Sequence, residues 1–556
     1  MKVLCIGLDG ATFDLIRPWI SKGKLPNLRK LMEEGVHADM TSVIPPLSPQ
    51  AWSSFMTGVN PGKHGVFGFK RQVNGKYEYE FTNSRNIRVK TLWGLLGELG
   101  KRVVVVNVPM TYPPEKVNGI MVSGMGTPGT GCDFTFPTEF KTELFQLAKD
   151  YRIHLHVWGS LDQPNKREEA LNALLKMTET RASLCTALMQ KYPWDFFSVV
   201  FSSVDQVQHH FWKYLGDNGR DVKNDDRFRD AILRVYEKND EVIGSLLEHI
   251  DEDTTVLVMS DHGAGGSSGT KIHIDEILKR EKLFAPAGSA GKNLSGIPFR
   301  LKRWSLRLLG KGKRALTKRL SSETKDAVLK LLPGIQGKLA TVSKLSGVDW
   351  SGTKVYPGEN VDFLRVNLRG KLPSGVVNPG SDYEDTVNLT IRRLEGLRHP
   401  ENGERLIEKV FRKEHLYHGP YTDEGPDLVI WTKDYKHAIG ADLTRNNHGR
   451  IVSSATGESD PSGTHRLNGI LIARGSHIKS GQQIASAHIQ DLFPTILHIM
   501  GCSVPVYSDG KVLSEIFVEG HSRSNPVSYA EMSMDKAAPV SGQSVYSDVE
   551  NKEIEQ

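Results

Sequence analysis

Cysteine is scarce in this chain, with four residues among 556. They stand far apart and form no Cys-x-x-Cys pair. This spacing argues against a disulfide framework and against a structural zinc ribbon. The four are Cys5, Cys132, Cys185 and Cys502.

Long apolar runs and an excess of one charge are also missing. No segment reaches the roughly 18 apolar residues of a membrane-spanning helix. The opening residues, MKVLCIGLDG, become acidic at Asp9 without a small-residue cleavage site, so they predict a first strand and not a secretion signal. The 71 basic and 65 acidic residues leave a net charge of +6, which indicates no partner. We therefore expect a cytoplasmic protein with no specific nucleic-acid partner.

Short buried runs alternate with helical patterns along most of the chain. This alternation predicts an α/β fold with a mainly parallel central sheet flanked by helices. We expect one core in two parts, residues 1–284 and 347–534, with cap elements in the second part, including a helix over Glu404–Lys413. Residues 285–346 read as a basic helical insert, and residues 535–556 as a disordered tail. The expected buried strands include Lys2–Leu8, Arg102–Val108, Trp194–Phe201, Thr254–Ser260 and Gly469–Ala473.

Ser48 opens the most distinctive stretch, IPPLSPQAWSSFMTGVNPGKHG. A serine before a proline and an apolar helical pattern predicts a helix start, with Ser48 as N-cap and Pro49 at the first helical position. Backbone N–H groups and the positive end of the helix dipole would then lie beside the hydroxyl, where a phosphate could bind. The alternative is that Ser48 serves only as a cap.

Aspartates follow three of the expected buried strands. Asp9 comes after the first, Asp205 after the strand that ends at Phe201, and Asp261 directly after Ser260. Open α/β sheets bind ligands at the carboxyl ends of their strands, so these aspartates are candidate ligands. His209 lies four residues after Asp205 in a helical pattern, on the same face. His262 follows Asp261, and His465 precedes another strand.

These side chains sort into two sets, Asp205 with His209 and His465, and Asp9 with Asp261, His262 and Ser48. Carboxylate and imidazole ligands suit zinc, manganese or iron(II) better than calcium. Two divalent ions about 4 Å apart, with zinc the first choice, would activate a nucleophile and neutralise phosphoryl oxygens. A serine alcohol needs such activation at neutral pH.

The chain resembles the alkaline phosphatase superfamily, and within it the type I phosphodiesterase and nucleotide pyrophosphatase family. The resemblance rests on GLDG, SPQAWSSFMTGVNPGKHG, SSVDQVQHHFW, MSDHGAG and GTHRLNGI, in the family's order. It implies phosphoryl transfer to Ser48 and then attack by water, on substrates such as phosphodiesters or pyrophosphates of nucleotides. It also implies one metal on Asp205, His209 and His465 and the other on Asp9, Asp261 and His262, with Ser48 bridging.

The sequence departs from the family at two positions. The nucleophile is serine where threonine is usual, and the asparagine that holds a phosphate oxygen is missing between Ser48 and Asn60. Asn107 or Lys271 would have to replace it. The preference for diesters over monoesters therefore stays open.

Several alternative functions remain. A phosphomutase, a phosphomonoesterase or a phosphonate hydrolase of the same superfamily would use the same residues, whereas a sulfatase would need a Cys-x-Pro-x-Arg run that the chain lacks. A different class is a membrane-surface protein that binds through the basic residues 297–320.

Overall fold

A computed structural model describes residues 1–155, 163–215, 226–287, 347–441, 449–455, 457, 460–536, 545–546, 550 and 554. Nearly all of the predicted basic insert, including residues 297–320, therefore lies outside the described part, as does most of the predicted disordered tail. Tyr546, in that tail, is described: its ring is buried against Tyr112, and its hydroxyl donates to the carbonyl of Gly126 at 2.9 Å.

The centre of the molecule is a ten-stranded, mainly parallel sheet, as the sequence predicts. Five neighbouring strands run parallel, and β19 (Asn468–Arg474) enters antiparallel between β9 and β2. The edge strand β7 (Thr135–Phe136) is also antiparallel, and the short strands β20 (Gln482–Gln483) and β21 (Ala487–His488) pair with β2. The five parallel strands, in spatial order, are β9 (Thr255–Met259), β1 (Val3–Leu8), β8 (Phe196–Phe201), β5 (Val103–Val106) and β6 (Gly119–Val122); β2 spans Val36–Thr41.

Helices cover both faces of this sheet because both faces are apolar. In β1, Leu4, Ile6 and Leu8 pack into one core and Val3 and Cys5 into the other, as the two-residue period of a strand requires. The first core holds α1 (Phe13–Ser21), α2 (Pro26–Glu34), α6 (Phe140–Leu147), α7 (Pro164–Lys191), α8 (Ser203–Phe211) and α9 (Ala231–Leu247). The second holds α3 (Ser48–Thr57), α5 (Leu92–Glu98) and α16 (Leu492–Ile499).

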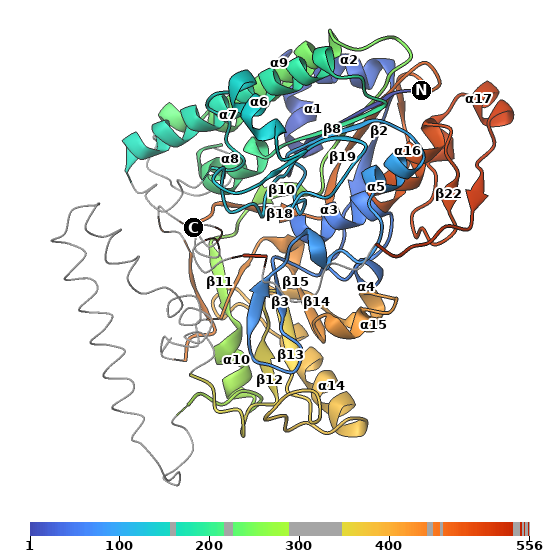
Figure 1. Cartoon of the computed structure of the whole chain (residues 1–556). Coiled ribbons are helices and arrows are strands. Elements are labelled where there is room, and N and C mark those ends of the chain that lie inside the picture. Colours follow the sequence, from blue (N-terminus) through green and yellow to red (C-terminus); the bar gives the residue numbers. More distant parts are fainter. Residues whose placement is uncertain are drawn as a thin grey trace.

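A smaller body lies against the carboxyl edge of the central sheet, in the lower half of Figure 1. We call it the cap. Its antiparallel sheet has the order β12-β13-β15-β14, and α10 (Ile274–Arg280) and α14 (Ser381–Glu395) pack on it. The cap strands are β12 (Val355–Pro357), β13 (Phe363–Val366), β15 (Leu428–Thr432) and β14 (Ile407–Arg412).

The helix predicted over Glu404–Lys413 is wrong, because this segment forms the strand β14. Strand β14 pairs antiparallel with β15, and its register shifts between Ile407 and Lys409. This irregularity buries Ile407 together with Val410 and Phe411, so the apolar residues repeat at three and four positions and mimic a helix. Pairing with β15 therefore makes this segment a strand and not a helix.

Small elements complete the described chain. Strands β10 (Gly263–Gly266) and β18 (Gly463–Arg466) form an antiparallel pair beside the central sheet. Strand β11 (Thr270–His273) pairs with β16 (Ala438–Gly440) and β17 (Val452–Ser454), and β3 (Lys70–Gln72) pairs with β4 (Tyr79–Phe81). The remainder are α4 (Pro61–His64), α15 (Lys413–Leu416), β22 (Val504–Pro505), α17 (Glu519–Ser524) and β23 (Tyr529–Ala530).

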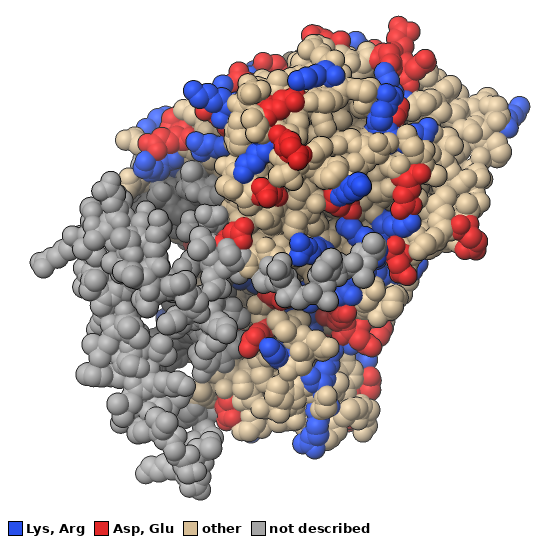
Figure 2. Space-filling view, viewed as in Figure 1, with Lys and Arg blue, Asp and Glu red and all other residues tan. Residues whose placement is uncertain are grey.

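Two observations concern the surface and a possible membrane span. Among the described residues, no helix has both the length and the apolar character needed to cross a bilayer. On the face shown in Figure 2, basic and acidic side chains are interspersed, with neither sign forming one large patch.

Candidate functional site

The three aspartates that follow strands meet at one edge of the central sheet. Strands β9, β1 and β8 are neighbours and run parallel, so their carboxyl ends lie side by side. Asp9 follows β1, Asp261 comes two residues after β9, and Asp205 lies in the first turn of α8, directly after β8. The sheet order therefore brings together residues that are far apart in sequence.

Asp9, Asp261 and His262 form what we call the inner cluster, which is completely buried. Each residue offers a ligand atom within 4.8 Å of the others, the arrangement required to hold one metal ion. His262 Nε2 lies 3.3 Å from Asp261 Oδ2 and 3.7 Å from Asp9 Oδ1. Among the described residues, both of these oxygens are buried without a hydrogen-bond partner. Two buried carboxylate oxygens in this state need a cation or a proton beside them.

Asp205, His209 and His465 form the outer cluster, which is partly exposed and meets the same 4.8 Å criterion. Asp205 Oδ1 lies 3.2 Å from His209 Nε2 and 3.5 Å from His465 Nε2. The rings of His465 and His262 stack with centroids 3.7 Å apart, so the two clusters share a wall.

The three imidazoles are held in the tautomer that binds metals. In each ring Nδ1 faces a main-chain carbonyl oxygen, and since a carbonyl only accepts, Nδ1 carries the hydrogen of the neutral ring and Nε2 has the free lone pair. His209 Nε2 and His465 Nε2 nevertheless lie 3.0 Å apart. Two lone pairs facing each other repel unless a proton or a metal ion lies between them. The carbonyl partners are Gly463 for His209 (3.1 Å), Pro46 for His465 (2.7 Å) and Gly263 for His262 (3.0 Å).

Ser48 lies against the inner cluster, with its Oγ 3.3 Å from His262 Nε2. The prediction that Ser48 is the N-cap is wrong by one position: Leu47 is the cap, Ser48 is the first residue of α3, and Pro49 is the second. The expected helix start is nevertheless present. The hydroxyl, which is 4% exposed, therefore lies where the N–H groups and the positive dipole end of α3 can interact with an anion.

Electrostatics differ between the clusters. In the inner cluster, burial and then the charges of Asp261 and Asp205 raise the pKa of Asp9 well above its usual range. Burial, followed by the charge of Asp205, raises the pKa of Asp261 to about 7. In the outer cluster, burial is outweighed by the ion pair of Asp205 with His209, which holds the pKa of Asp205 well below its usual range and raises that of His209 to about 9.

Neither Asn107 nor Lys271 is brought to Ser48 by any contact among the described residues. Asn107 lies beyond the end of β5, where its side-chain amide, oriented to satisfy its neighbours, donates to the carbonyl of Ile153 at 3.1 Å and accepts from the Arg181 guanidinium at 3.0 Å. Lys271 lies in β11, where its side chain extends over Gly440. Their contacts in the described part are with packing neighbours, so a substrate-binding role for either residue stays a prediction.

Sequence reasoning missed the groups that support the clusters. Trp52 Nε1 donates to Asp9 Oδ2 at 3.4 Å, and the main-chain N–H of Gly10 donates to Asp261 Oδ1 at 3.2 Å. The contact of Trp52 could have been found from its four-residue spacing from Ser48, because this spacing places both side chains on one face of α3. The carbonyl partners of the imidazoles carry no signal in the sequence.

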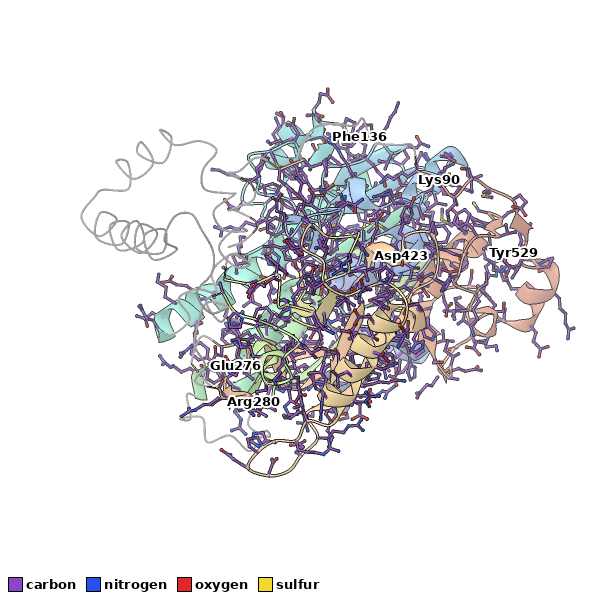
Figure 3. The ribbon with its side chains drawn as sticks, turned by 90° about the horizontal axis from the view of Figure 1, so that it is seen from below. Lys90, Phe136, Glu276, Arg280, Asp423 and Tyr529 are labelled. Atoms are coloured by element: carbon purple, nitrogen blue, oxygen red, sulfur yellow. The ribbon has the colours of Figure 1, made fainter. Side chains whose placement is uncertain are left out.

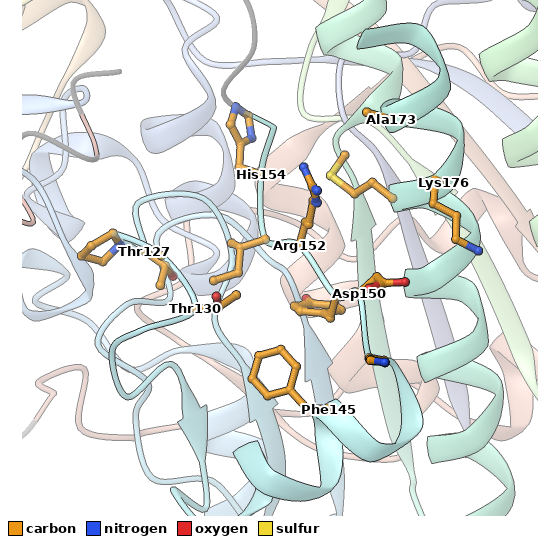
Figure 4. A pocket seen from close by; sticks show the side chains of 14 residues that line it. Thr127, Thr130, Phe145, Asp150, Arg152, His154, Ala173 and Lys176 are labelled. Carbon is orange, nitrogen blue, oxygen red and sulfur yellow. The ribbon is translucent and has the colours of Figure 1, made fainter. Parts of the chain in front are cut away.

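A separate cavity of about 550 Å³ opens between α6, α7 and the loop after β6. Figure 4 shows Thr130, Arg152 and His154 among its lining residues. His154 Nδ1 lies 3.3 Å from Gln206 Nε2 in α8, so the cavity borders the helix that carries part of the outer cluster. The chain continues from this wall into residues 156–162, which are outside the described part.

Among three similar solved structures, the two with TM-scores of 0.51 and 0.50 support the fold. A fourfold-substituted variant of alkaline phosphatase PafA is 13% identical with a TM-score of 0.51, covering 93% of this chain and 98% of that one. Phosphonoacetate hydrolase from Sinorhizobium meliloti with phosphonoformate is 14% identical with a TM-score of 0.50, covering 89% and 94%. Human ectonucleotide pyrophosphatase/phosphodiesterase 5 is 12% identical with a TM-score of 0.49, covering 92% and 97%.

The sequence itself identifies the family. Among curated proteins, none matches the chain. The family profile described as type I phosphodiesterase/nucleotide pyrophosphatase, however, matches residues 3–465, which include Ser48 and both clusters. The chain therefore belongs to the type I phosphodiesterase/nucleotide pyrophosphatase family and is a phosphohydrolase.

Proposed function

We propose that this protein is a metal-dependent hydrolase that cleaves phosphodiester or pyrophosphate bonds, with nucleotide-type substrates favoured, through a phosphoserine at Ser48. The close approach of His209 Nε2 and His465 Nε2, 3.0 Å apart with both Nδ1 atoms facing carbonyl oxygens, is the observation on which the proposal rests. This arrangement suits a bound cation. The orphaned carboxylate oxygens of the inner cluster support a second one.

The residues fit two divalent ions. The outer cluster would hold one and the inner cluster the other, and the mixed imidazole and carboxylate donors favour zinc, with manganese or iron(II) as alternatives. When bound, such a pair lowers the pKa of a serine alcohol and neutralises phosphoryl oxygens.

The chain's own groups then carry the reaction. Ser48 Oγ gives its proton to solvent and forms a bond to phosphorus while the bond to the leaving oxygen breaks, and the leaving oxygen takes up a proton from water. The N-terminal end of α3 is positioned to stabilise the phosphoryl oxygens through its N–H groups and dipole. In the second half, a water oxygen attacks the phosphoserine and Ser48 Oγ departs and recovers a proton. The carbonyl bonds of the imidazoles keep the pocket shaped throughout.

The decisive experiment replaces the nucleophile. Ser48→Ala is expected to abolish hydrolysis of bis-p-nitrophenyl phosphate and p-nitrophenyl phosphate by metal-reconstituted protein. Ser183→Ala, at an exposed serine of α7, is the matched control and should keep full activity. Acid quenching during turnover, followed by peptide mass spectrometry, should find the phosphoryl group on Ser48. Full activity of Ser48→Ala, or phosphorylation elsewhere, would reject the mechanism.

A substrate panel separates the remaining alternatives. Nucleotide diesters, dinucleoside polyphosphates, monoesters and phosphonates should be compared after reconstitution with zinc, manganese or iron(II). The missing asparagine after Ser48 leaves a monoesterase or phosphonate hydrolase as the second candidate. Faster turnover of monoesters or phosphonates than of any diester would favour it, and phosphate exchange without release would favour a phosphomutase.

A further inference from the structure

Gln208 lies in α8 between two ligands of the outer cluster, and the mechanism has not used it. Asp205 comes three residues before it and His209 directly after it, and this spacing places all three side chains towards one side of the helix. Gln208 is buried, so its amide has to find its hydrogen bonds inside the protein. The partners of this amide therefore indicate what the side chain does.

The amide of Gln208 binds the main chain beside the inner cluster. Gln208 Nε2 donates to the carbonyl oxygen of Gly10 at 2.8 Å. The N–H of the same glycine donates to Asp261 Oδ1 at 3.2 Å, and Gly10 directly follows Asp9 in the sequence. Gly10 therefore links a side chain of the helix that carries the outer cluster with both carboxyls of the inner cluster.

Gly10 also lies against the outer cluster itself. Its φ is 71°, in the left-handed region, and a Cβ atom at this position would lie 3.0 Å from Asp205 Oδ1. A larger residue would strain the turn and press on a ligand of the outer cluster. The turn fits between the two clusters because it is a glycine, and Gln208 holds its carbonyl oxygen.

Tyr236, in α9, fixes the orientation of the Gln208 amide. The Tyr236 hydroxyl accepts from the main-chain N–H of Thr12 at 3.2 Å and donates to Gln208 Oε1 at 3.0 Å. Since the carbonyl oxygen of Gly10 only accepts, Nε2 must face Gly10 and Oε1 must face the hydroxyl. Tyr236 is fully buried, so the amide is held in this one orientation.

We propose that Gln208 is a positioning residue that, through Gly10, keeps the inner cluster at a set distance from the outer one and so fixes the spacing of the two bound ions. Without this amide, the turn at Gly10 loses its bond to α8, and the N–H that supports Asp261 is held less firmly. A reaction that uses two ions requires both at set positions around one phosphorus atom, so a looser turn slows the chemical step. This inference rests on the proposed function, but its first measurement is zinc binding, which needs no substrate.

The test measures zinc binding at each cluster separately, by competition with a fluorescent zinc chelator. Gln208→Met keeps most of the side-chain volume and removes the amide. The affinity of the inner cluster should fall about five- to tenfold, while that of the outer cluster stays within about twofold of the wild type. The affinity that disappears in Asp261→Ala belongs to the inner cluster, and the one that disappears in Asp205→Ala belongs to the outer cluster.

Turnover at saturating zinc separates position from affinity. Under this condition Gln208→Met has both ions bound, so a loss of activity reports their placement. On bis-p-nitrophenyl phosphate, kcat should fall about three- to tenfold with KM nearly unchanged.

Gln206→Met is the matched control, because Gln206 is also a buried glutamine of α8. Its Nε2 donates to Ser202 Oγ at 3.1 Å and faces His154 Nδ1 at 3.3 Å, and neither partner belongs to a cluster. Both zinc affinities and kcat should therefore equal those of the wild type.

Tyr236→Phe gives a second reading that barely changes the packing of the core. It removes only the hydroxyl that orients Gln208, so the affinity of the inner cluster should fall about two- to threefold. The double variant should lose no more than Gln208→Met alone, because Tyr236 acts through Gln208. Tyr529→Phe, at a tyrosine that is 59% exposed and lies at the edge of the molecule in Figure 3, is its control and should change neither affinity.

Three results would overturn the inference and leave the proposed hydrolysis standing. They are an inner-cluster affinity of Gln208→Met within about twofold of the wild type, an equal loss at both clusters, and the same loss in Gln206→Met. A wild type that binds zinc at both clusters but hydrolyses no ester would remove the proposed function, and the zinc affinities would then decide the role of Gln208 alone. A wild type that binds zinc at neither cluster would remove both.

Discussion

The two metal-ligand clusters have similar donors but opposite surroundings. His262, in the inner cluster, is 0% exposed, whereas the His209 side chain in the outer cluster is 29% exposed. The inner cluster combines two carboxyls whose pKa values are raised with an imidazole whose pKa burial lowers to about 3. The outer cluster pairs one carboxylate with a histidine whose pKa is raised.

The two clusters therefore differ both in how strongly the fold depends on a bound ion and in how easily solvent reaches that ion. The outer cluster can neutralise itself by protonating His209 next to Asp205, so without metal it is an ordinary ion pair. The inner cluster has no such internal partner, because protonation of His262 is disfavoured. We infer that an ion in the inner cluster stabilises the fold more and exchanges more slowly.

The largest effect is expected when an aspartate is removed from either cluster. Asp261→Ala and Asp205→Ala should each lower kcat by about 10³ or more on both p-nitrophenyl substrates, since each loses a charged ligand. Metal analysis should show that each variant has lost the ion of its own cluster. Asp253→Ala, at an exposed aspartate, is the control. Full activity in either cluster variant would contradict the two-ion site.

Removing the two ions should lower the stability of the folded protein by a different amount for each cluster. An ion present at a thousandfold excess over its Kd stabilises the folded state by about 4 kcal/mol. Titration with a chelator should therefore lower Tm in two steps. The ion of the partly exposed outer cluster should leave first with the smaller change, because protonated His209 replaces part of its charge. A single step, or the larger fall first, would refute the comparison.

A smaller effect should appear in the pH dependence of the metal-free protein. The folded-state pKa of Asp261 is raised from 3.8 to about 7. Between these values the folded protein holds a proton that the unfolded chain has released, so this contribution is complete below 3.8 and is lost as pH rises towards 7. Relative to Asp261→Asn, the wild type should lose at most about 4 kcal/mol across this window.

Thermal unfolding with a chelator, repeated across this range, measures the difference between the two proteins. Added zinc should remove the slope, because the ion replaces the proton. If the stability of the wild type relative to Asp261→Asn rose with pH, the Asp261 carboxyl would be ionised in the metal-free protein, and the expected rise in its pKa would be wrong.

The smallest effect concerns Trp52, which supports only the inner cluster. Trp52→Phe removes the donor to Asp9 Oδ2 and keeps most of the ring volume. We expect metal affinity at the inner cluster to fall about two- to fivefold, the value of one long hydrogen bond, with the outer cluster unchanged. Competition with a fluorescent zinc chelator measures both. Trp350→Phe, in the cap, is the matched control, and an equal loss at both clusters would show that the ring acts through the fold.

Strand positions and the candidate ligands could be predicted from the sequence because each rests on a local pattern. Apolar runs such as Phe196–Phe201 mark buried strands, and an acid directly after the run marks the edge of the sheet. The spatial order of the strands in the sheet could not be predicted from the sequence, because it depends on which apolar faces pack together. His465 enters on β18, paired with β10, from two hundred positions further along the chain, and only the folded sheet shows its neighbours.

The failures share a physical cause, which is that tertiary contacts override local preference. The apolar spacing of Leu406, Ile407, Val410 and Phe411 is helical, but pairing with β15 and a register shift make it a strand. Asn107 follows a buried strand as the aspartates do, and its amide is held by Ile153 and Arg181, so its role in phosphate binding stays a prediction.

The carbonyl bond on each imidazole has a consequence for the life of the enzyme. A ring anchored at Nδ1 cannot swing away when its ion departs, so the vacated binding site retains its form. Depleted protein should consequently regain activity at the pace of ion capture from solution and require no refolding. An organism that meets intermittent metal shortage would keep a dormant pool of this enzyme ready for immediate use.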